Sequence, residues 1–222
     1  MLHKTQGIVF RFTKYGETSI IVNIFTDLFG LQGYIVNGVR SKSARNKIAL
    51  FQPLTLLDMV VYHRENANLN RIKEIKCLHP FQTITTDIKK SGIAIFINEM
   101  LNKTVKDESH TRELCTFIIH ALITLDTLSD NVENFHLIFL LKLSRRLGFG
   151  AHRVNEILGP RMAEAETEEK IEKLLTADFD KPIQISNAQR REILEHILRF
   201  YSDHLENLGE LKSVQVLREI MS

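Results

Sequence analysis

The first third of the chain alternates between apolar and polar positions with a period of two residues. In segment 19–26, Ile20, Val22 and Ile24 share one face, a pattern typical of a half-buried strand. Segments 4–12, 31–36, 54–63 and 69–78 are the other predicted strands, and segment 4–12 is rich in Thr, Val, Ile and Phe. Five short strands with no comparable helix among them predict a small closed barrel. An OB-fold fits best, and an SH3-like barrel remains the alternative that strand counting leaves open.

Turn residues separate these predicted strands. Gly30 ends the turn at 27–30 because glycine adopts positive φ without steric cost. Pro53 is expected at the opening of the fourth strand, since proline cannot donate a ladder hydrogen bond. Ile72 and Ile75 interrupt the alternation of the fifth strand, and we expect a β-bulge there.

After Pro80 the apolar period becomes helical, which predicts a second module. Ser186 followed by Gln189 forms a capping box that opens one helix, and Gly148 and Gly150 end another. The predicted fold class is α+β multidomain, with a five-stranded OB-fold barrel at 1–80 and an α-helical domain at 81–222. The helical segments are expected at about 86–103, 114–125, 132–147, 163–176, 186–205 and 213–221.

Charge divides between the same two modules. Residues 1–82 hold eleven Lys and Arg against five Asp and Glu, a net charge of +6, whereas residues 83–222 carry −4. A basic module joined to an acidic one indicates different partners, and the basic module is suited to polyanions. The alternative is that +6 is ordinary scatter for a small domain.

Four bases and no acid lie in the segment between the third and fourth predicted strands. Lysine and arginine there would neutralise phosphates, and the intervening Ser and Asn residues would add neutral hydrogen bonds. Tyr15 and Tyr34 offer rings for base stacking. The alternatives are a solvated basic loop and half-buried tyrosines. The four bases are Arg40, Lys42, Arg45 and Lys47.

Motifs for catalysis and for cofactors fail on inspection. Gly33 and Gly38 have the spacing of a phosphate loop, but Val39 and Arg40 follow instead of Lys and Ser/Thr. Cys77 and Cys115 are too few for a four-ligand zinc site. We therefore predict a non-enzyme with no cofactor, no metal site and no small-molecule substrate. The short apolar runs predict no membrane segment, and the polar start of the chain predicts a cytoplasmic location.

The order of several short motifs resembles the RecO family of bacterial recombination mediators. They are Gly7-Ile8-Val9, Tyr15-Gly16-Glu17-Thr18, the segment 26–30, Gly38-Val39-Arg40 and Phe51-Gln52-Pro53-Leu54. The similarity is strongest over residues 4–79. Arg145-Arg146-Leu147-Gly148-Phe149 and the C-terminal segment 210–219 also look like family elements.

This resemblance implies a function. RecO-like proteins have an N-terminal OB-fold and a helical domain, bind single- and double-stranded DNA, and anneal complementary strands. With RecR they help load RecA onto DNA coated by the single-strand-binding protein SSB, whose acidic tail they recognise. Many members carry a four-cysteine zinc site after the segment matching 145–149, but residues 150–182 contain no cysteine. That zinc site is therefore expected to be absent here. The resemblance also implies that the protein works in the cytoplasm in association with the nucleoid. The alternative function is an adaptor that binds only proteins.

If the protein is a RecO-like mediator, two groups of residues become candidate binding sites. DNA is expected on Arg11, Lys14, Tyr15, Arg40, Lys42, Arg45, Lys47, Arg71 and Lys73. The SSB tail is expected in an apolar pocket rimmed by basic residues, formed by Phe135, Ile138, Phe139, Lys142, Arg145, Arg146, Arg190 and Arg191. The alternative is that the apolar residues of this set are all core and that its basic residues form a solvated face.

Overall fold

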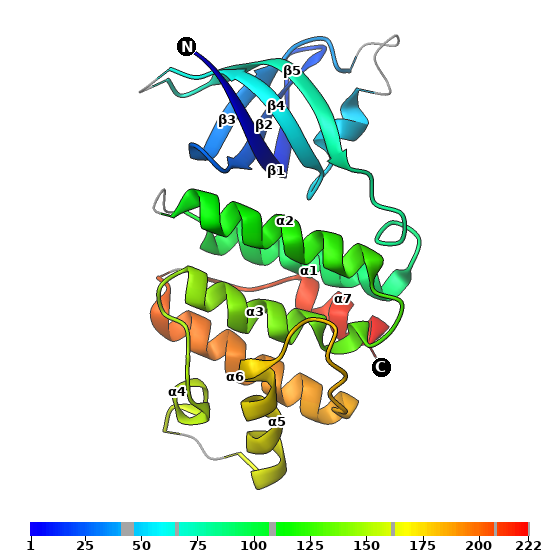
Figure 1. Ribbon diagram of the computed structural model, residues 1–222, viewed down its shortest axis with the longest axis vertical. Coiled ribbons are helices and arrows are strands. Elements are labelled where there is room, and N and C mark those ends of the chain that lie inside the picture. Colours follow the sequence, from blue (N-terminus) through cyan, green and yellow to red (C-terminus); the bar gives the residue numbers. More distant parts are fainter. Residues whose placement is uncertain (41–46, 65–66, 107–109, 161–162, 207, 222) are drawn as a thin grey trace. The chain divides into compact units, whose positions relative to one another are not determined.

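Five strands make up most of the N-terminal region in a computed structural model of the protein (Figure 1). The structure describes residues 1–40, 47–64, 67–106, 110–160, 163–206 and 208–221. Among the residues predicted to bind DNA, Lys42 and Arg45 lie outside these ranges. The strands are β1 (Leu2–Tyr15), β2 (Ser19–Thr26), β3 (Gly30–Val36), β4 (Leu56–Tyr62) and β5 (Asn70–His79).

The strands close into a barrel in the order β1-β2-β3-β5-β4, with β1 also paired to β4. Four of the pairings are antiparallel, and the closing pair β3–β5 is parallel. The predicted five-stranded barrel is confirmed, and its arrangement is that of an OB-fold. The predicted bulge in β5 is also present, because the register passes from Val60↔Glu74 to Val61↔Ile72 and leaves Lys73 unpaired.

Alternation along the strands fills the barrel interior. Ile20, Val22 and Ile24 are fully buried, as their shared face predicts. Gly30 has a φ of 64° at the predicted turn. Pro53 precedes Leu54, which has a positive φ of 66°, so β4 begins two residues later than predicted. The barrel core contains Val9, Ile20, Val22, Ile24, Tyr34, Val39, Phe51, Leu57, Met59 and Val61.

Helices follow the barrel as the period change predicts. The capping box is present, with Ser186 Oγ accepting from the Gln189 backbone and the Gln189 side chain accepting from the Ser186 backbone. The short helix α4 was not predicted. The elements are the 3-10 helices η2 (Ile48–Phe51) and η3 (Val132–Asn134), and α1 (Ile88–Thr104), α2 (Thr111–Thr127), α3 (Phe135–Arg146), α4 (Val154–Leu158), α5 (Ala165–Thr176), α6 (Asn187–His204) and α7 (Ser213–Ile220).

The chain forms two compact units, which we call the barrel unit and the helical unit. The barrel unit contains Met1–Phe81 and Val105–Ile123, and the helical unit contains Gln82–Thr104 and Thr124–Ser222. The first part of α2 therefore groups with the barrel. A division of function at residue 80 stays a prediction. In the described ranges, every helix is too short or too polar to cross a lipid bilayer.

Close packing fixes α7 within the helical unit. A Cβ atom added to Gly92 would lie 1.8 Å from Ile220 Cδ1, so a larger residue at this position of α1 would force the Ile220 side chain of α7 to move. The Glu99 carboxylate accepts from the backbone N–H groups of Lys212 and Ser213 at 3.1 and 2.8 Å. Glu99 therefore satisfies N–H groups at the start of α7 that have no partner within the helix.

Candidate nucleic-acid interface

The outer face of the barrel brings basic and aromatic side chains together. Paired residues of neighbouring strands point to the same side of a sheet, so the register defines rows of side chains across the barrel. One row joins Arg11 to Asn23 and Gly33. The next row contains Thr13, Ile21, Ile35, Arg71 and Tyr62.

Two exposed tyrosines lie on this face. Tyr15 is 51% exposed and Tyr62 is 46% exposed, so both present rings on which a base can stack. Tyr34, which the sequence offered as a second stacking ring, is fully buried. Burial raises the pKa of the Tyr34 hydroxyl, and this ring is core rather than surface.

A cavity of about 740 Å³ opens beside Tyr62, a size typical of small-ligand sites. Arg64 and Arg71 contribute positive charge to its wall, while Ile35 and Leu69 contribute apolar surface. Asn70 is 3% exposed and fixes the wall, because its Oδ1 accepts from the Arg64 backbone at 3.1 Å and its Nδ2 donates to Gln32 Oε1 at 3.2 Å. Aromatic, apolar and cationic side chains in one hollow suit a nucleotide.

Sequence reasoning missed Tyr62 and Arg64. Both lie at the end of the fourth predicted strand, in the run Tyr62-His63-Arg64. An aromatic residue two positions before a base, where a strand meets a loop, was the available signal. The register that places Tyr62 beside Arg71 joins residues nine apart in the chain, and the sequence alone does not define that pairing.

The remaining residues predicted to contact DNA lie in different parts of the barrel unit. Arg40 Nη1 donates to Gly16 O and its backbone N–H donates to Thr18 O, both at 3.0 Å, so Arg40 lies at the turn between β1 and β2. Lys14 is exposed beside that turn, and Lys47 is exposed before η2. Lys73 Nζ lies 3.6 Å from Glu74 Oε1, so an adjacent acid offsets the charge of Lys73.

Arg11 lies against a neutral partner on the outer face. With the Asn23 amide turned so that its oxygen faces Arg11, that oxygen accepts from Arg11 Nε at 3.1 Å and from Nη2 at 3.3 Å. This contact orients the guanidinium without neutralising its charge. Arg11 is therefore suited to a phosphate contact, because it keeps both its charge and further N–H donors.

The predicted tail-binding residues on α3 divide between the interior and the surface, and Arg145 is among the exposed ones. Phe135, Ile138 and Phe139 are at most 2% exposed, so the apolar floor of the predicted pocket is not open. Arg145 donates to Ala151 O and, from Nη2 at 2.7 Å, to Leu175 O. Arg146 is exposed at the end of α3.

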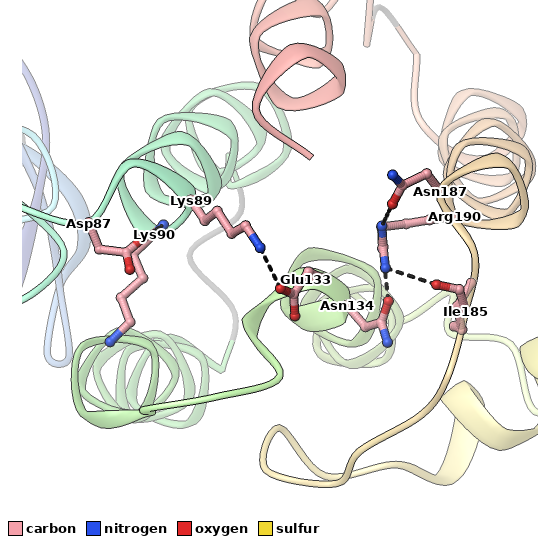
Figure 2. Close-up of polar contacts among 8 residues, drawn as sticks. All are labelled: Asp87, Lys89, Lys90, Glu133, Asn134, Ile185, Asn187 and Arg190. Atoms are coloured by element: carbon pink, nitrogen blue, oxygen red, sulfur yellow. Dashed lines mark hydrogen bonds and ion pairs between the residues drawn. The ribbon is translucent and has the colours of Figure 1, made fainter. Parts of the chain in front are cut away.

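Arg190 is also internal. It is 8% exposed and donates to Asn134 Oδ1 at 3.0 Å, to Asn187 Oδ1 at 2.6 Å and to Ile185 O at 3.0 Å, as Figure 2 shows. Figure 2 also shows the nearby ion pair of Lys89 with Glu133, which lowers the pKa of the Glu133 carboxyl. Arg190 thus fixes the start of α6 to η3 and to the segment before α6.

A small hollow with basic residues lies between α6 and α7. Leu194, Leu217 and Met221 contribute apolar surface, and Arg191 and Arg218 are exposed at its edge. Arg218 Nη2 lies 2.6 Å from Glu195 Oε1. This hollow has the chemistry predicted for the tail pocket, although only Arg190 and Arg191 of the predicted residues line it.

No metal-binding arrangement stands out in the described ranges, where no three His, Cys, Asp or Glu side chains gather as a metal site requires. Cys115 is buried and Cys77 is partly buried. Burial raises the pKa of the Cys115 thiol, which disfavours the thiolate that nucleophilic or metal chemistry needs.

Comparisons with known proteins agree across the chain. Residues 1–81 match the family model described as Recombination protein O N terminal, and residues 85–156 match Recombination protein O C terminal. The DNA repair protein RecO of Flavobacterium johnsoniae is 38% identical over 237 aligned positions, covering 99% of both chains. Proteins of the same name from Flavobacterium psychrophilum and Bacteroides fragilis are 35% and 33% identical, again over 99% of each chain. The chain belongs to the RecO family of DNA repair and recombination proteins.

Proposed function

We propose that this protein is a non-catalytic recombination mediator that binds single- and double-stranded DNA through the outer face of its barrel. The observation that carries the proposal is the row in which Arg71 and Tyr62 lie side by side, next to the row of Arg11. Cations neutralise phosphates and exposed rings stack bases. The protein would act at the nucleoid in the cytoplasm.

Single strands would use both features of this face. An unpaired base would stack on Tyr62 in the cavity beside Arg64 and Arg71, and a neighbouring phosphate would lie on Arg71. A duplex keeps its bases paired and stacked, so it would depend on phosphate contacts alone. Arg11, Arg71 and the basic segment 38–47, which includes Arg40, would supply those contacts.

Strand annealing would follow from charge neutralisation. Two single strands repel because each carries one negative charge per nucleotide, and a basic surface that holds both reduces that repulsion. We propose that the protein, together with RecR, uses this property to help load RecA onto single-stranded DNA coated by SSB. The helical domain, residues 81–222, would bind the SSB tail.

An adaptor that binds only proteins remains the rival function. A salt titration of DNA affinity separates the two, measured by fluorescence anisotropy with the double variant Arg11→Ala/Arg71→Ala. If each arginine neutralises one phosphate, the salt slope should fall by roughly 1.4 on single strands and 1.8 on duplex. Absence of DNA affinity at low salt would favour the adaptor.

A matched control removes the same charge from another part of the barrel. Lys4 and Lys76 both lie beside Asp58, with Nζ–Oδ2 distances of 4.0 and 3.1 Å. Because an acid already offsets their charge, Lys4→Ala/Lys76→Ala should leave the salt slope close to wild type. If the salt slope falls by the same amount in both double variants, total charge drives binding rather than the two rows that contain Arg11 and Arg71.

The basic segment is tested separately, with Arg40, Lys42, Arg45 and Lys47 all changed to Ala. Arg40→Ala removes the side-chain hydrogen bond to Gly16 O, which should cost about 1 kcal/mol, so a thermal unfolding curve confirms that the variant is folded before its affinity is measured. Affinity should fall by orders of magnitude at low salt and equally for all sequences, because phosphate contacts carry no base information. A slope equal to wild type would make the segment a solvated spacer.

A further inference from the structure

An acidic, aromatic segment of the chain itself contacts two of the α3 residues predicted to bind the SSB tail, Phe135 and Lys142. This segment, residues 177–185, joins α5 to α6, and we call it the strap. Its Phe179 ring stacks on Phe135 with centroids 4.3 Å apart and planes 15° apart. Asp178 Oδ1 lies 3.0 Å from Lys142 Nζ, and the same Nζ lies 5.7 Å from the centre of the Phe179 ring.

The chemistry of this contact matches what the sequence predicted for an external ligand. The tail-binding residues were expected to recognise an acidic peptide with an apolar end, by an apolar surface beside bases. Phe179 supplies the apolar group, and Asp178 and Asp180 on either side supply the carboxylates. Phe135 and Lys142 receive the first two of these groups. The strap therefore occupies the site as a ligand would.

Firm contacts hold the strap at its two ends. At the α5 end, Arg145 Nη2 donates to Leu175 O at 2.7 Å. Toward α6, Asn134 Nδ2 donates to Ile183 O at 2.7 Å and Arg190 Nη2 donates to Ile185 O at 3.0 Å; the second of these is drawn in Figure 2. The ends are thus fixed to α3, η3 and α6.

The middle of the strap is held more weakly. Phe179 is 6% exposed and is its apolar anchor, whereas the Asp178 side chain is 71% exposed. An ion pair so exposed contributes little to stability. Asp180, Lys181 and Pro182 are exposed, and the backbone hydrogen bond from Lys181 to Asp178 closes a turn within the strap. Local opening of such a segment costs far less than global unfolding.

We propose that the strap is an internal plug that an acidic peptide with an aromatic side chain, supplied by a partner, displaces from α3. The inference rests on the proposed function, in which that partner is the SSB tail. Wild type would bind the peptide only in the open form, so the apparent affinity is reduced by the open fraction. A peptide at high local concentration would bind the open form and increase its population. After the peptide dissociates, the contacts at the two ends of the strap would keep it close enough to α3 to bind there again.

The absence of tryptophan from the chain provides a direct reporter. In Phe179→Trp, the single tryptophan replaces the anchor ring, and its emission reports whether the anchor is buried. The probes are a synthetic SSB tail peptide chosen to be free of tryptophan and a peptide copying residues 177–183, which contain none. Saturating peptide should shift the emission to the red, and a copy with its acids replaced by lysine should not.

Two charge variants of the strap complete the test without creating a cavity. Asp178→Lys replaces the weak attraction to Lys142 with like charges and should raise the open fraction, which tightens peptide binding by about threefold if the open form is initially near 10%. Asp180→Lys makes the same charge change on the neighbouring exposed turn and should leave the affinity within about twofold of wild type. Duplex binding serves as the folding control for both variants.

The outcomes separate the plug from the proposed function. Tighter binding in Asp178→Lys with a red shift in Phe179→Trp supports both. Binding to Asp178→Lys but not to wild type supports the plug and removes the tail from the functions of the wild-type protein. Binding that is equal in all proteins, with no red shift, overturns the plug and favours the hollow between α6 and α7. Failure of every protein to bind either peptide overturns both.

Discussion

Two buried cations of the helical unit are used in the opposite way to the arginines on the outer face of the barrel. On the barrel, Arg11 and Arg71 are exposed on the outer face of the sheet. In the helical unit, Lys90 is 4% exposed and Arg190 is 8% exposed. Lys90 Nζ donates to Thr83 Oγ1, Asp126 O and Leu128 O at 2.6, 3.0 and 2.5 Å. Arg11 and Arg71 thus present their charge to solvent, whereas Lys90 and Arg190 use theirs in internal hydrogen bonds.

The difference shows that counting bases does not locate a binding surface. Strands place alternate side chains outward, so a base on an outward position keeps its charge available to a polyanion. Lys90 and Arg190 instead satisfy carbonyl and side-chain oxygens between elements, where an unsatisfied buried acceptor is costly. Substitution of an exposed basic residue should therefore change DNA binding, whereas substitution of a buried one should change stability.

The largest expected effect is the loss of stability on replacing a buried base. Arg190→Met leaves Asn134 Oδ1 and Ile185 O without their donor, which should cost about 3 kcal/mol of the free energy of unfolding. Arg191→Met, at the exposed neighbouring position, should cost within about 0.5 kcal/mol. Urea unfolding of both variants measures the difference, and equal losses would remove the structural role assigned to Arg190.

The next largest expected effect is the loss of base stacking on the outer face of the barrel. Tyr62→Ala removes a stacking ring from the outer face, so single-strand affinity should fall by about 1–3 kcal/mol while duplex affinity changes little. Tyr62→Phe keeps the ring and should bind as wild type does. Anisotropy with a short oligonucleotide and its duplex makes the measurement. An equal loss for both DNA forms would assign Tyr62 to the fold rather than to base stacking.

Sequence patterns predicted the barrel well because its alternation has one dominant cause. Ile20, Val22 and Ile24 face one interior, so period two follows directly from burial. The β5 bulge was equally visible, since Ile72 and Ile75 cannot both keep that period with one partner strand. The capping box at Ser186 and Gln189 was predictable because it is entirely local.

The site on α3 was harder to predict because helical periodicity does not say what covers an apolar face. Phe135, Ile138 and Phe139 looked like a pocket floor, but Phe179, forty residues or more away in the chain, stacks on Phe135. Tyr62 was missed for a similar reason, because its neighbour Arg71 is set by strand register. Local chemistry was readable in both places, whereas the partners brought by the fold were not.

A pH dependence should distinguish the helical unit at mild acidity. Burial and the nearby Arg190 charge lower the pKa of His136 to about 3, against about 6.5 in an unfolded chain. Between these values the unfolded state binds the proton and the folded state does not, so stability falls as pH decreases. From this group the loss should reach at most about 1.4 kcal/mol per pH unit below 6.5.

Comparing wild type with His136→Leu isolates that contribution. The pKa of Glu133 lies below the usual carboxyl range, chiefly because Lys89 hydrogen-bonds to it, so its effect on stability begins at lower pH. Urea unfolding at pH 7.0, 6.0 and 5.0 should give a slope for wild type that is reduced in the variant. Parallel slopes would mean that His136 has the same pKa in the folded and unfolded states.

The smallest effect compares two fully buried tyrosines, one in each unit. The Tyr201 hydroxyl donates to Leu140 O at 2.7 Å in the helical unit, whereas the Tyr34 hydroxyl in the barrel has no hydrogen-bond partner among the described residues. Removing a hydrogen-bonded hydroxyl loses about 1 kcal/mol, but removing an unsatisfied one relieves a desolvation penalty. Tyr201→Phe should therefore destabilise the protein, and Tyr34→Phe should leave stability unchanged or raise it by less than about 1 kcal/mol. Urea unfolding of the two variants at neutral pH measures the contrast, because both remove a single oxygen atom from a buried ring. A loss in Tyr34→Phe as large as that in Tyr201→Phe would show that the barrel hydroxyl is hydrogen-bonded in solution, and the barrel interior would then contain a polar contact that its apolar alternation does not predict.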